Sequence, residues 1–568
     1  MTRRNSPEDP VHGGLTPTVL TALLALAAAA AAHAAPTLLA HVNGYTLSGA
    51  QLVRFDALAF DHGRVLATGQ EAALARRFPD AQRIDAHGST LLPGLIDAHG
   101  HVLDLGLEST RIQLVGTRSL AEAQQRIRDY ARAHPASRWL LGDGWNQVLW
   151  GLGRFPLARE LDQAAGDRPA VLWRVDGHAA WLDTAALRLA GITRATPDPA
   201  GGRIERDPDG VPSGVLVDKA MELAERVVPP PTAAESSAAL RAAFRHMNSV
   251  GLTAVGDAGC PGWEIALYRE LADRRELTVR VYAMIRGTGA DFDALARSGP
   301  LIGYGDDRLT VRAVKLFADG ALGSRGAALL APYTDMPTQR GLLFMTDDEM
   351  EHKVEKALRA GYQVNVHAIG DAANRQVLDA FERAYAAVGG RQLRNRIEHA
   401  QVVALSDIPR LRQLDLIASM QPTHATSDKN MAEDRLGRER LAGAYAWRTF
   451  LAQGTRIAGG SDFPVESDNP FFGLHAAVTR QDHDNQPPGG WRPQQAMTLL
   501  EAFRAFTIDA AYAEHWERSI GSLEPGKWAD FILIDRDLFR IAPADIWKIR
   551  VAETWIAGRR VYDRAAPP

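Results

Sequence analysis

The sequence contains almost no cysteine. Cys260 is the only one among 568 residues, so the chain can form neither an internal disulfide nor a CxxC metal site. Without covalent cross-links a chain of this length depends on a large core, and a hydrophobic content of 46% is sufficient to build one. We expect Cys260 itself to be a small buried side chain and not a reactive thiol.

An excess of charge of one sign is also absent. The chain has 64 Lys and Arg against 68 Asp and Glu, a formal net charge of −4, and no long run of either sign. A protein that binds nucleic acid usually shows a basic excess or a basic stripe. The charge balance therefore gives no reason to expect nucleic acid or an acidic membrane surface as a partner.

Long apolar runs are missing except near the N-terminus. There Arg3 and Arg4 precede "VLTALLALAAAAAAHA" (19–34), which closes on the small-residue pattern Ala32-His33-Ala34. This pattern predicts a signal peptide over residues 1–34, export to the periplasm, and no stable membrane association after cleavage. An uncleaved membrane anchor is the alternative, although the run is short and alanine-rich for a spanning helix.

Short apolar runs alternate with amphipathic stretches through most of the chain. This alternation is typical of repeated β-α units around a parallel sheet. Eight units predict an α/β fold of the (β/α)8 TIM-barrel type over residues 93–514. The eight runs are residues 91–102, 252–259, 278–285, 311–320, 362–371, 395–403, 416–424 and 455–463.

Two further regions flank or interrupt this barrel. About 150 residues separate the first run from the second, far more than a β-α connection needs. We expect them to form a large insert after strand 1, at about residues 105–245, over the mouth of the barrel. Residues 35–92 and 515–568 both show short strands and glycine turns, which predicts one composite β-sandwich built from the two segments.

The first strand ends in "LLPGLIDAHGH", residues 91–101. His99 and His101 are two residues apart, so in a strand they point the same way, into the C-terminal end of the barrel where active sites of this fold lie. An HxH pair alone is a weak signal, because two core or surface histidines would look the same.

Other strand ends carry the same kind of residue. His367 ends the fifth run, His399 the sixth and Asp462 the eighth. Imidazole and carboxylate together suit zinc or a similar divalent ion. Lys315 lies in the apolar fourth run, where a neutral amine could react with carbon dioxide to give an anionic carbamate. The alternative is a salt bridge from Lys315 to Asp319 or Glu398.

Several segments resemble the amidohydrolase superfamily, specifically its family 3, the group that contains N-substituted formamide deformylase. The resemblance extends over nearly the whole chain after the signal peptide. It rests on "LLPGLIDAHGH", "VKLFADGALGSRGA", "VNVHAIGDAANRQVLDAF", "RIEHAQVV", "SMQPTH", "GGSDFPV" and "GSLEPGKWADFILID".

The resemblance implies a centre with two divalent metal ions. It implies that His99, His101 and Asp462 hold one ion, and that His367 and His399 hold the second. A carboxylated Lys315 would bridge the two ions. No residue departs from the family pattern at these six positions, and a variant with a single metal ion stays open.

The implied reaction is hydrolysis of a linear C–N amide bond, in an N-formyl or N-acyl amide, by a metal-activated hydroxide. Asp462 would accept the proton of the water and pass it to the departing nitrogen. The alternatives are an ester or lactone hydrolase or a deaminase on the same barrel, and a binding protein without catalysis. Lys315 argues against the mononuclear deaminase arrangement.

Four residues are candidates for substrate binding: His178 and Trp181 in the insert, Arg325 in "GALGSRGA", and His424 beyond the seventh run. Each has a structural alternative. Trp181 could belong to the core of the insert, His424 could cap a loop, and Arg325 could pair with Asp319. The sequence does not decide the identity of the amide or whether the protein forms a homodimer.

Overall fold

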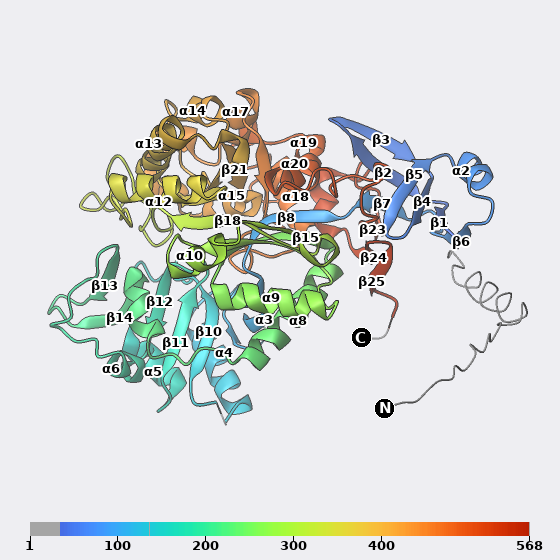
Figure 1. Ribbon diagram of the computed structural model, residues 1–568. Coiled ribbons are helices and arrows are strands. Elements are labelled where there is room, and N and C mark those ends of the chain that lie inside the picture. Colours follow the sequence, from blue (N-terminus) through green and yellow to red (C-terminus); the bar gives the residue numbers. More distant parts are fainter. Residues whose placement is uncertain (1–34, 109, 136, 567–568) are drawn as a thin grey trace, which may run out of the picture.

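The structure is a computed structural model that describes residues 35–108, 110–135 and 137–566. The predicted signal peptide therefore lies outside the described residues. Within them, no helix combines the length and the apolar character that a bilayer crossing requires. The described chain forms a barrel, a separate sheet inserted into the barrel, and two sheets near the chain ends (Figure 1).

Eight parallel strands form the barrel, and each of them comes from one of the eight predicted runs, which confirms the barrel prediction. Neighbouring strands pair in chain order, with the short β17 (Leu301–Gly303) antiparallel to the fourth strand. The strands are β8 (Leu95–Gly100), β15 (Leu252–Cys260), β16 (Arg280–Arg286), β18 (Leu309–Phe317), β19 (Gln363–Ala368), β20 (Arg396–His399), β21 (Ile417–Met420) and β22 (Ile457–Gly459).

The barrel closes through a short junction and not through a full ladder. Gly100 and Phe463 form an isolated parallel bridge. The amide of Asp462 donates to the carbonyl of His99 at 2.7 Å, and the amide of His101 donates to the carbonyl of Phe463 at 2.8 Å. We call residues 99–101 and 462–463 the closing junction.

Helices cover the barrel and share its main apolar cluster. The helix α12 begins at a capping box, in which Thr346 and Glu349 satisfy each other's backbone amides. The helices outside the insert are α3 (Val102–Glu108), α8 (Ala233–Ser249), α9 (Gly262–Asp273), α10 (Ala290–Ala296), α11 (Tyr304–Asp307), α12 (Asp347–Arg359), α13 (Asp371–Val388), α14 (Ile408–Gln413), α15 (Pro422–Asp428), α16 (Ala432–Arg440), α17 (Trp447–Ala452), α18 (Pro470–Thr479), α19 (Leu499–Ala505) and α20 (Ile508–Ala513). The short helix α7 (Glu222–Glu225) follows the last strand of the insert, and its Ala224 packs in an apolar cluster of the insert.

The segment between β8 and β15 contains its own six-stranded sheet, drawn below the barrel in Figure 1. Its order is β13-β14-β12-β11-β10-β9, and α4 (Leu120–Ala133), α5 (Ala158–Ala165) and α6 (Thr184–Leu189) accompany it. The strands are β9 (Ile112–Gln113), β10 (Leu140–Trp145), β11 (Ala170–Arg174), β12 (Ala179–Leu182), β13 (Gly202–Arg206) and β14 (Pro212–Asp218). The later helix α8 buries its apolar side chains in the barrel cluster, so this sheet ends well before it.

Two sheets lie beside the barrel at the chain ends (Figure 1). One is formed by N-terminal strands alone, in the order β5-β4-β1-β6, with α2 (Glu71–Arg77) beside it; the other mixes both ends, in the order β25-β24-β23-β7-β2-β3. Apolar residues of both sheets meet in one buried cluster. The strands are β1 (Thr37–Ala40), β2 (Asn43–Ser48), β3 (Gln51–Phe55), β4 (Ala57–Asp61), β5 (Arg64–Gly69), β6 (Gln82–Asp85), β7 (Thr90–Pro93), β23 (Phe531–Ile534), β24 (Val551–Ile556) and β25 (Arg559–Asp563).

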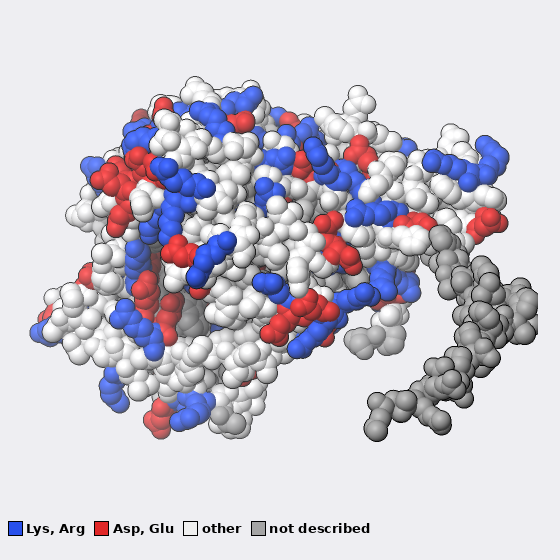
Figure 2. Space-filling model, in the orientation of Figure 1, with Lys and Arg blue, Asp and Glu red and all other residues white. Residues whose placement is uncertain are grey.

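Positive and negative side chains are interspersed on the face shown in Figure 2, and neither sign occupies a broad area by itself. This distribution agrees with the near-balance of charge in the sequence.

Candidate metal centre

Strand alternation explains why polar side chains enter the barrel. On β19, the side chains of Val364 and Val366 belong to the main apolar cluster, which the barrel shares with its surrounding helices. The alternate residues Gln363, Asn365 and His367 point to the opposite side, and Gln363 and Asn365 are hydrogen-bonded to each other at 3.2 Å. His367 is the last of this inward series, so the strand delivers its imidazole to the C-terminal mouth of the barrel.

Four of the six predicted ligands meet at this mouth. The Lys315 Nζ atom lies 3.0 Å from His99 Nε2. Asp462 Oδ1 lies 3.2 Å from His101 Nε2 and 3.5 Å from His99 Nε2. One ligand atom from each of His99, His101 and Asp462 falls within 4.8 Å of the other two, which is the spacing of a shared ion.

The remaining two predicted ligands lie against this group. The ring centroid of His399 is 4.6 Å from that of His367 and 4.9 Å from that of His99. His424, which the sequence assigns to substrate binding, also comes close: its Nε2 atom is 3.7 Å from Asp462 Oδ2. His399, His424 and Asp462 form a second group with ligand atoms within 4.8 Å, so His424 is placed where it could reach an ion as well as a substrate.

Two of these residues have a backbone that is costly for a side chain. His399 has a φ of 70° and Asp462 a φ of 61°, in the left-handed region. Non-glycine residues in that region cost on the order of 1 kcal/mol, and such residues cluster at functional sites. The surrounding structure therefore holds both side chains in orientations that an ordinary strand end would not give.

Glu398 supports His99 from a neighbouring position in the barrel. Its carboxylate contacts His99 Nδ1 and accepts hydrogen bonds from Arg396 Nε at 2.6 Å and Arg396 Nη2 at 2.9 Å. All three side chains are buried. Because Nδ1 donates to the carboxylate, Nε2 of His99 is left to face Lys315 and Asp462. Glu398 is adjacent to His399 in the sequence, but the histidine that its carboxylate contacts is His99.

Asp97 ties the two sides of the closing junction together. Its carboxylate accepts from the amide of His99 at 3.0 Å and from the hydroxyl of Ser461 at 2.6 Å. A Cβ atom at Gly460 would lie 2.7 Å from Asp97 Oδ1 and 2.8 Å from the amide nitrogen of His99. Only glycine lets the chain after β22 approach β8 this closely.

Burial sets the protonation states of the centre. It lowers the pKa of His99 to about 4 and holds the pKa values of His367 and His399 well below the usual range, so these rings are neutral and have lone pairs to offer. Burial also lowers the pKa of Lys315 to about 8. For Asp462 burial acts in the opposite direction, but the contact with His101 and the neighbouring histidines outweigh it and keep its pKa well below the usual range.

These residues fit a divalent metal ion. Asp462 Oδ1, His367 Nε2 and His424 Nε2 are buried atoms with no hydrogen-bond partner among the residues that the structure describes. Buried polar atoms are normally satisfied. Neutral imidazoles and a carboxylate with unmet lone pairs around one space form a typical donor set for zinc and related ions.

The insert brings His178 to the same mouth. The ring centroid of His178 lies 5.2 Å from that of His367, and its Nδ1 atom lies 2.8 Å from Asp218 Oδ1. Burial opposes charge on the ring, but the hydrogen bond and the charge of Asp218 outweigh this and raise the pKa of His178. Of the substrate-binding candidates in the insert, His178 is the one that faces the metal ligands.

Trp181 lies elsewhere. It is 0% exposed, in contact with Trp145 and Trp150, and its Nε1 donates to the carbonyl of Leu157 at 3.0 Å. These contacts belong to the core of the insert. The geometry therefore favours the structural alternative for Trp181 over a contact with substrate.

The alternatives weighed for two basic residues are not realised. Among the described side chains, Lys315 has no ion pair with Asp319 or Glu398. Arg325 pairs with Asp335 at 2.9 Å and not with Asp319. Its guanidinium is thus engaged by a carboxylate ten residues further along the chain.

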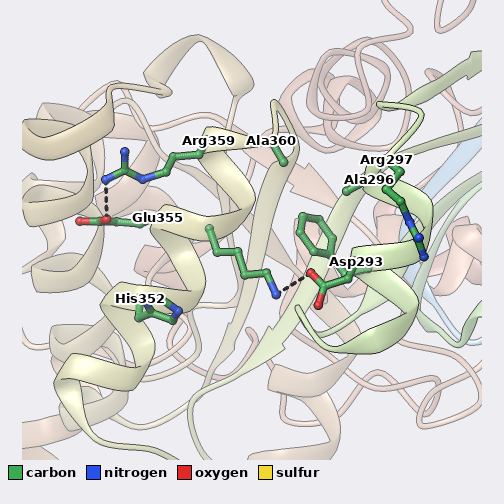
Figure 3. Close-up of a pocket in the computed structure, with 9 residues that line it drawn as sticks. Asp293, Ala296, Arg297, His352, Glu355, Arg359 and Ala360 are labelled. Atoms are coloured by element: carbon green, nitrogen blue, oxygen red, sulfur yellow. Dashed lines mark hydrogen bonds and ion pairs between the residues drawn. The ribbon is translucent and has the colours of Figure 1, made fainter.

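A pocket on the outer surface lies between α10 and α12 (Figure 3). It has a volume of about 530 Å³, and its charged side chains pair with each other: Lys356 with Asp293 at 2.6 Å and Arg359 with Glu355 at 3.0 Å. None of the predicted ligands lines this pocket. This outer pocket is therefore not part of the candidate metal centre.

Two residues of the site were missed by sequence reasoning. Gln421 accepts a hydrogen bond through its Oε1 atom from His399 Nδ1 at 2.9 Å. Its position directly after β21 was a usable signal. Asp218, the partner of His178, follows an apolar strand in the same way, but nothing in the sequence pairs it with a residue 40 positions earlier.

Comparison with known proteins agrees with this geometry. A family model described as the amidohydrolase family matches residues 82–562. The chain is 32% identical over 524 residues to the putative amidohydrolase YtcJ of Bacillus subtilis, covering 90% of this chain and 97% of the relative. It is 29% identical over 532 residues to the N-substituted formamide deformylase of Arthrobacter pascens, covering 89% and 95%.

A solved structure is similar along the same length. The crystal structure of an uncharacterized metal-dependent hydrolase from Pyrococcus horikoshii matches with a TM-score of 0.73 at 27% identity, covering 90% of this chain and 99% of that chain. The family model spans most of the chain, and the barrel and the cluster of potential ligands agree with it. The protein is a metal-dependent hydrolase and belongs to the amidohydrolase family.

Proposed function

We propose that the protein hydrolyses a linear C–N amide bond of a small molecule, with an N-formyl or N-acyl amide as the substrate class. The observation that carries the proposal is the position of Asp462, which contacts both histidines of the HxH pair at the open end of the barrel. The similarity to an N-substituted formamide deformylase supports the choice of bond.

The proposed cofactors are two divalent metal ions, with zinc as the first candidate. His99, His101 and Asp462 would hold one, and His367 and His399 the other, with a carbamate on Lys315 between them. The buried position and lowered pKa of Lys315 support the carbamate, because part of this amine is neutral near pH 8 and a neutral amine adds carbon dioxide with release of one proton. Bound metal ions supply Lewis acidity for water and for the substrate carbonyl.

In the proposed reaction, Asp462 transfers the proton of the attacking water. Asp462 is a carboxylate at neutral pH because its pKa is depressed, so it can accept a proton from the attacking water. The same carboxylate then delivers that proton to the departing nitrogen, whose bond to the carbonyl carbon breaks. His424 and His178 are the nearest candidates to contact the substrate.

The test is a hydrolysis screen on protein of known metal content. Its substrates are N-formyl, N-acetyl and longer N-acyl amines and the matching esters. We expect amide cleavage, and we expect D462A to lose it while the chain stays folded, as judged by circular dichroism. Near-normal turnover by D462A would overturn the assignment, and cleavage of esters alone would favour the ester hydrolase.

We also propose that the protein is exported and matures by cleavage after Ala34. The basis is the sequence pattern alone. N-terminal sequencing of protein recovered from the periplasm should find Ala35 first, and an intact N-terminus would contradict export by this route.

A further inference from the structure

The ring of His101 has less support from its surroundings than the ring of His99. Nδ1 of His99 contacts the buried carboxylate of Glu398. The ring of His101 contacts Asp462, which is itself a proposed ligand, and no further side chain among the described residues is hydrogen-bonded to it. The side chain of His101 is also 27% exposed. The backbone on either side of His101 must therefore set the direction of its ring.

Asp257 is the side chain that holds this backbone from the neighbouring strand. It lies opposite Gly100 in the ladder between β8 and β15, and it is 2% exposed. Its Oδ1 atom accepts a hydrogen bond of 3.0 Å from the amide of Val102, the residue directly after His101. Val102 is fully buried, so its amide needs a partner within the protein. Asp257 is that partner.

The chain cannot supply this hydrogen bond from position 101. The helix α3 begins at Val102, and the carbonyl of His101 accepts from the amide of Leu105 at 3.0 Å, so His101 is the N-cap residue. The side chain of an N-cap residue usually accepts from amides of the first turn. The ring of His101 instead contacts Asp462. Asp257 therefore caps the first turn from β15, because the side chain at position 101 is engaged elsewhere.

The other carboxylate oxygen of Asp257 is held by different groups. Oδ2 accepts a hydrogen bond from the hydroxyl of Tyr268 in α9 at 2.5 Å and lies 3.1 Å from Sγ of Cys260. Ligand atoms of Asp257, Cys260 and Glu264 lie within 4.8 Å of one another, but these hydrogen bonds already satisfy the group. The two oxygens thus have separate tasks: Oδ2 fixes the carboxylate to α9, and Oδ1 fixes the backbone next to His101.

We infer that Asp257 is a positioning residue for His101. By accepting from the amide of Val102, it aims the His101 ring at the ion that this ring and Asp462 are proposed to share. The inference rests on the metal centre of the proposed function and makes no use of the substrate. What the site needs from position 257 is an acceptor oxygen and not a charge.

The experiment compares wild type, D257A, D257N and Y268F by competition for Zn²⁺ against a chelator. D257A removes the acceptor, and loss of a group that supports a metal ligand weakens metal binding by about 10- to 100-fold. We expect a loss of this size in D257A. Asparagine keeps one acceptor oxygen for the Val102 amide, and its NH2 group can donate to the oxygen of Tyr268. The Zn²⁺ affinity of D257N should therefore stay within about threefold of the wild type.

Y268F is the matched control for a loss of stability. It removes a buried hydrogen bond from the same carboxylate but leaves Oδ1 bonded to the Val102 amide. Its melting temperature should fall, as should that of D257A, because each change leaves a buried group without its partner. The Zn²⁺ affinity of Y268F should nevertheless stay within about threefold of the wild type.

Two further measurements do not depend on turnover. With Co²⁺ in place of Zn²⁺, the visible absorption spectrum of D257A should differ from that of the wild type, because the ligand geometry changes. In metal-free protein, amide hydrogen exchange at residues 102–108 should be faster in D257A and unchanged in D257N, because only D257A loses the acceptor for Val102.

The outcomes separate this inference from the proposed function. A Zn²⁺ affinity of D257A within about twofold of the wild type would overturn the inference. Equal losses in D257A and D257N would overturn it too, because the charge would then matter and not the acceptor. Equal losses in D257A and Y268F would do the same, because affinity would then follow stability. Wild type that binds Zn²⁺ but cleaves neither amides nor esters overturns the proposed function alone, and wild type that binds no Zn²⁺ overturns both.

Discussion

Replacement of Glu398 by glutamine should weaken both the barrel and its metal centre. Glu398 and Arg396 are both fully buried, and the carboxylate accepts two hydrogen bonds from the guanidinium while it also contacts His99 Nδ1. Burial alone would raise the pKa of Glu398, but the charge of Arg396 and the hydrogen bond with His99 hold it well below the usual range. The side chain is therefore ionised in the native state and serves two donors at once.

The glutamine of E398Q has one acceptor oxygen for the two donor side chains, Arg396 and His99. Its NH2 group would face one of these donors without forming a hydrogen bond. The Arg396 charge then stays buried without a counter-charge. Breaking a buried pair in this way costs about 3 to 5 kcal/mol of the free energy of unfolding. Loss of the group that orients a ligand histidine weakens metal binding by about 10- to 100-fold. We expect both effects in E398Q.

The assay combines urea unfolding with metal competition against a chelator. The double variant R396M/E398Q separates the two effects, because it removes the buried charge along with its partner. We expect it to regain part of the stability and none of the metal affinity, since His99 still lacks its carboxylate. If E398Q kept the stability of the wild type within about 0.5 kcal/mol and its metal affinity within about twofold, the reasoning would be refuted.

Three further changes test other parts of the structure. G460A should cost about 1 to 3 kcal/mol and reduce metal content, because its Cβ would overlap the Asp97 carboxylate. E501Q should remove an acid-sensitive stabilisation: contact with Arg448 lowers the pKa of Glu501 from 4.5 to about 2, so this stabilisation is complete above pH 4.5 and is lost as the pH falls toward 2. The stability difference between wild type and E501Q should shrink over that interval in acid unfolding. W181F should lower stability by about 1 to 2 kcal/mol with KM unchanged, since the indole hydrogen bond and part of the ring are lost in the core of the insert.

Each of these changes has a control or a contrary outcome. G69A introduces a Cβ that meets Leu74 at an ordinary contact distance of 3.9 Å, and it should leave stability and metal content unchanged. A constant gap between wild type and E501Q across the acid range would show that the carboxylate contributes nothing through its ionisation. If W181F were as stable as the wild type but had a raised KM, Trp181 would belong to the substrate site and not only to the core of the insert.

The barrel was predictable because its signals are local. Each strand is a short apolar run between turn signals, and a side chain at the C-terminal end of such a strand must lie at the mouth. His367 and His399 were placed by this rule alone. The rule does not give distances between strands, so the resemblance to a known family was needed to propose how the residues divide between metal ions.

The remainder of the site depends on contacts that no local pattern encodes. The Asp218 to His178 hydrogen bond joins two strands of the insert, and the orientation of His99 depends on Glu398 from another strand of the barrel. The core position of Trp181 follows from its packing against Trp145 and Trp150, which lie more than 30 residues earlier in the sequence. Side-chain partners of this kind become visible only when the tertiary structure is known.

The closing junction has a consequence for how the protein loses its structure. The first and last strands of the barrel are joined there by few backbone hydrogen bonds, and the residues on either side of the gap are proposed metal ligands. An ion bound by His99, His101 and Asp462 would connect the first strand of the barrel to the segment that follows the last strand. Removal of this ion by a chelator would weaken the contact between β8 and β22. Protease sensitivity near Phe463 would then rise before the rest of the protein unfolds.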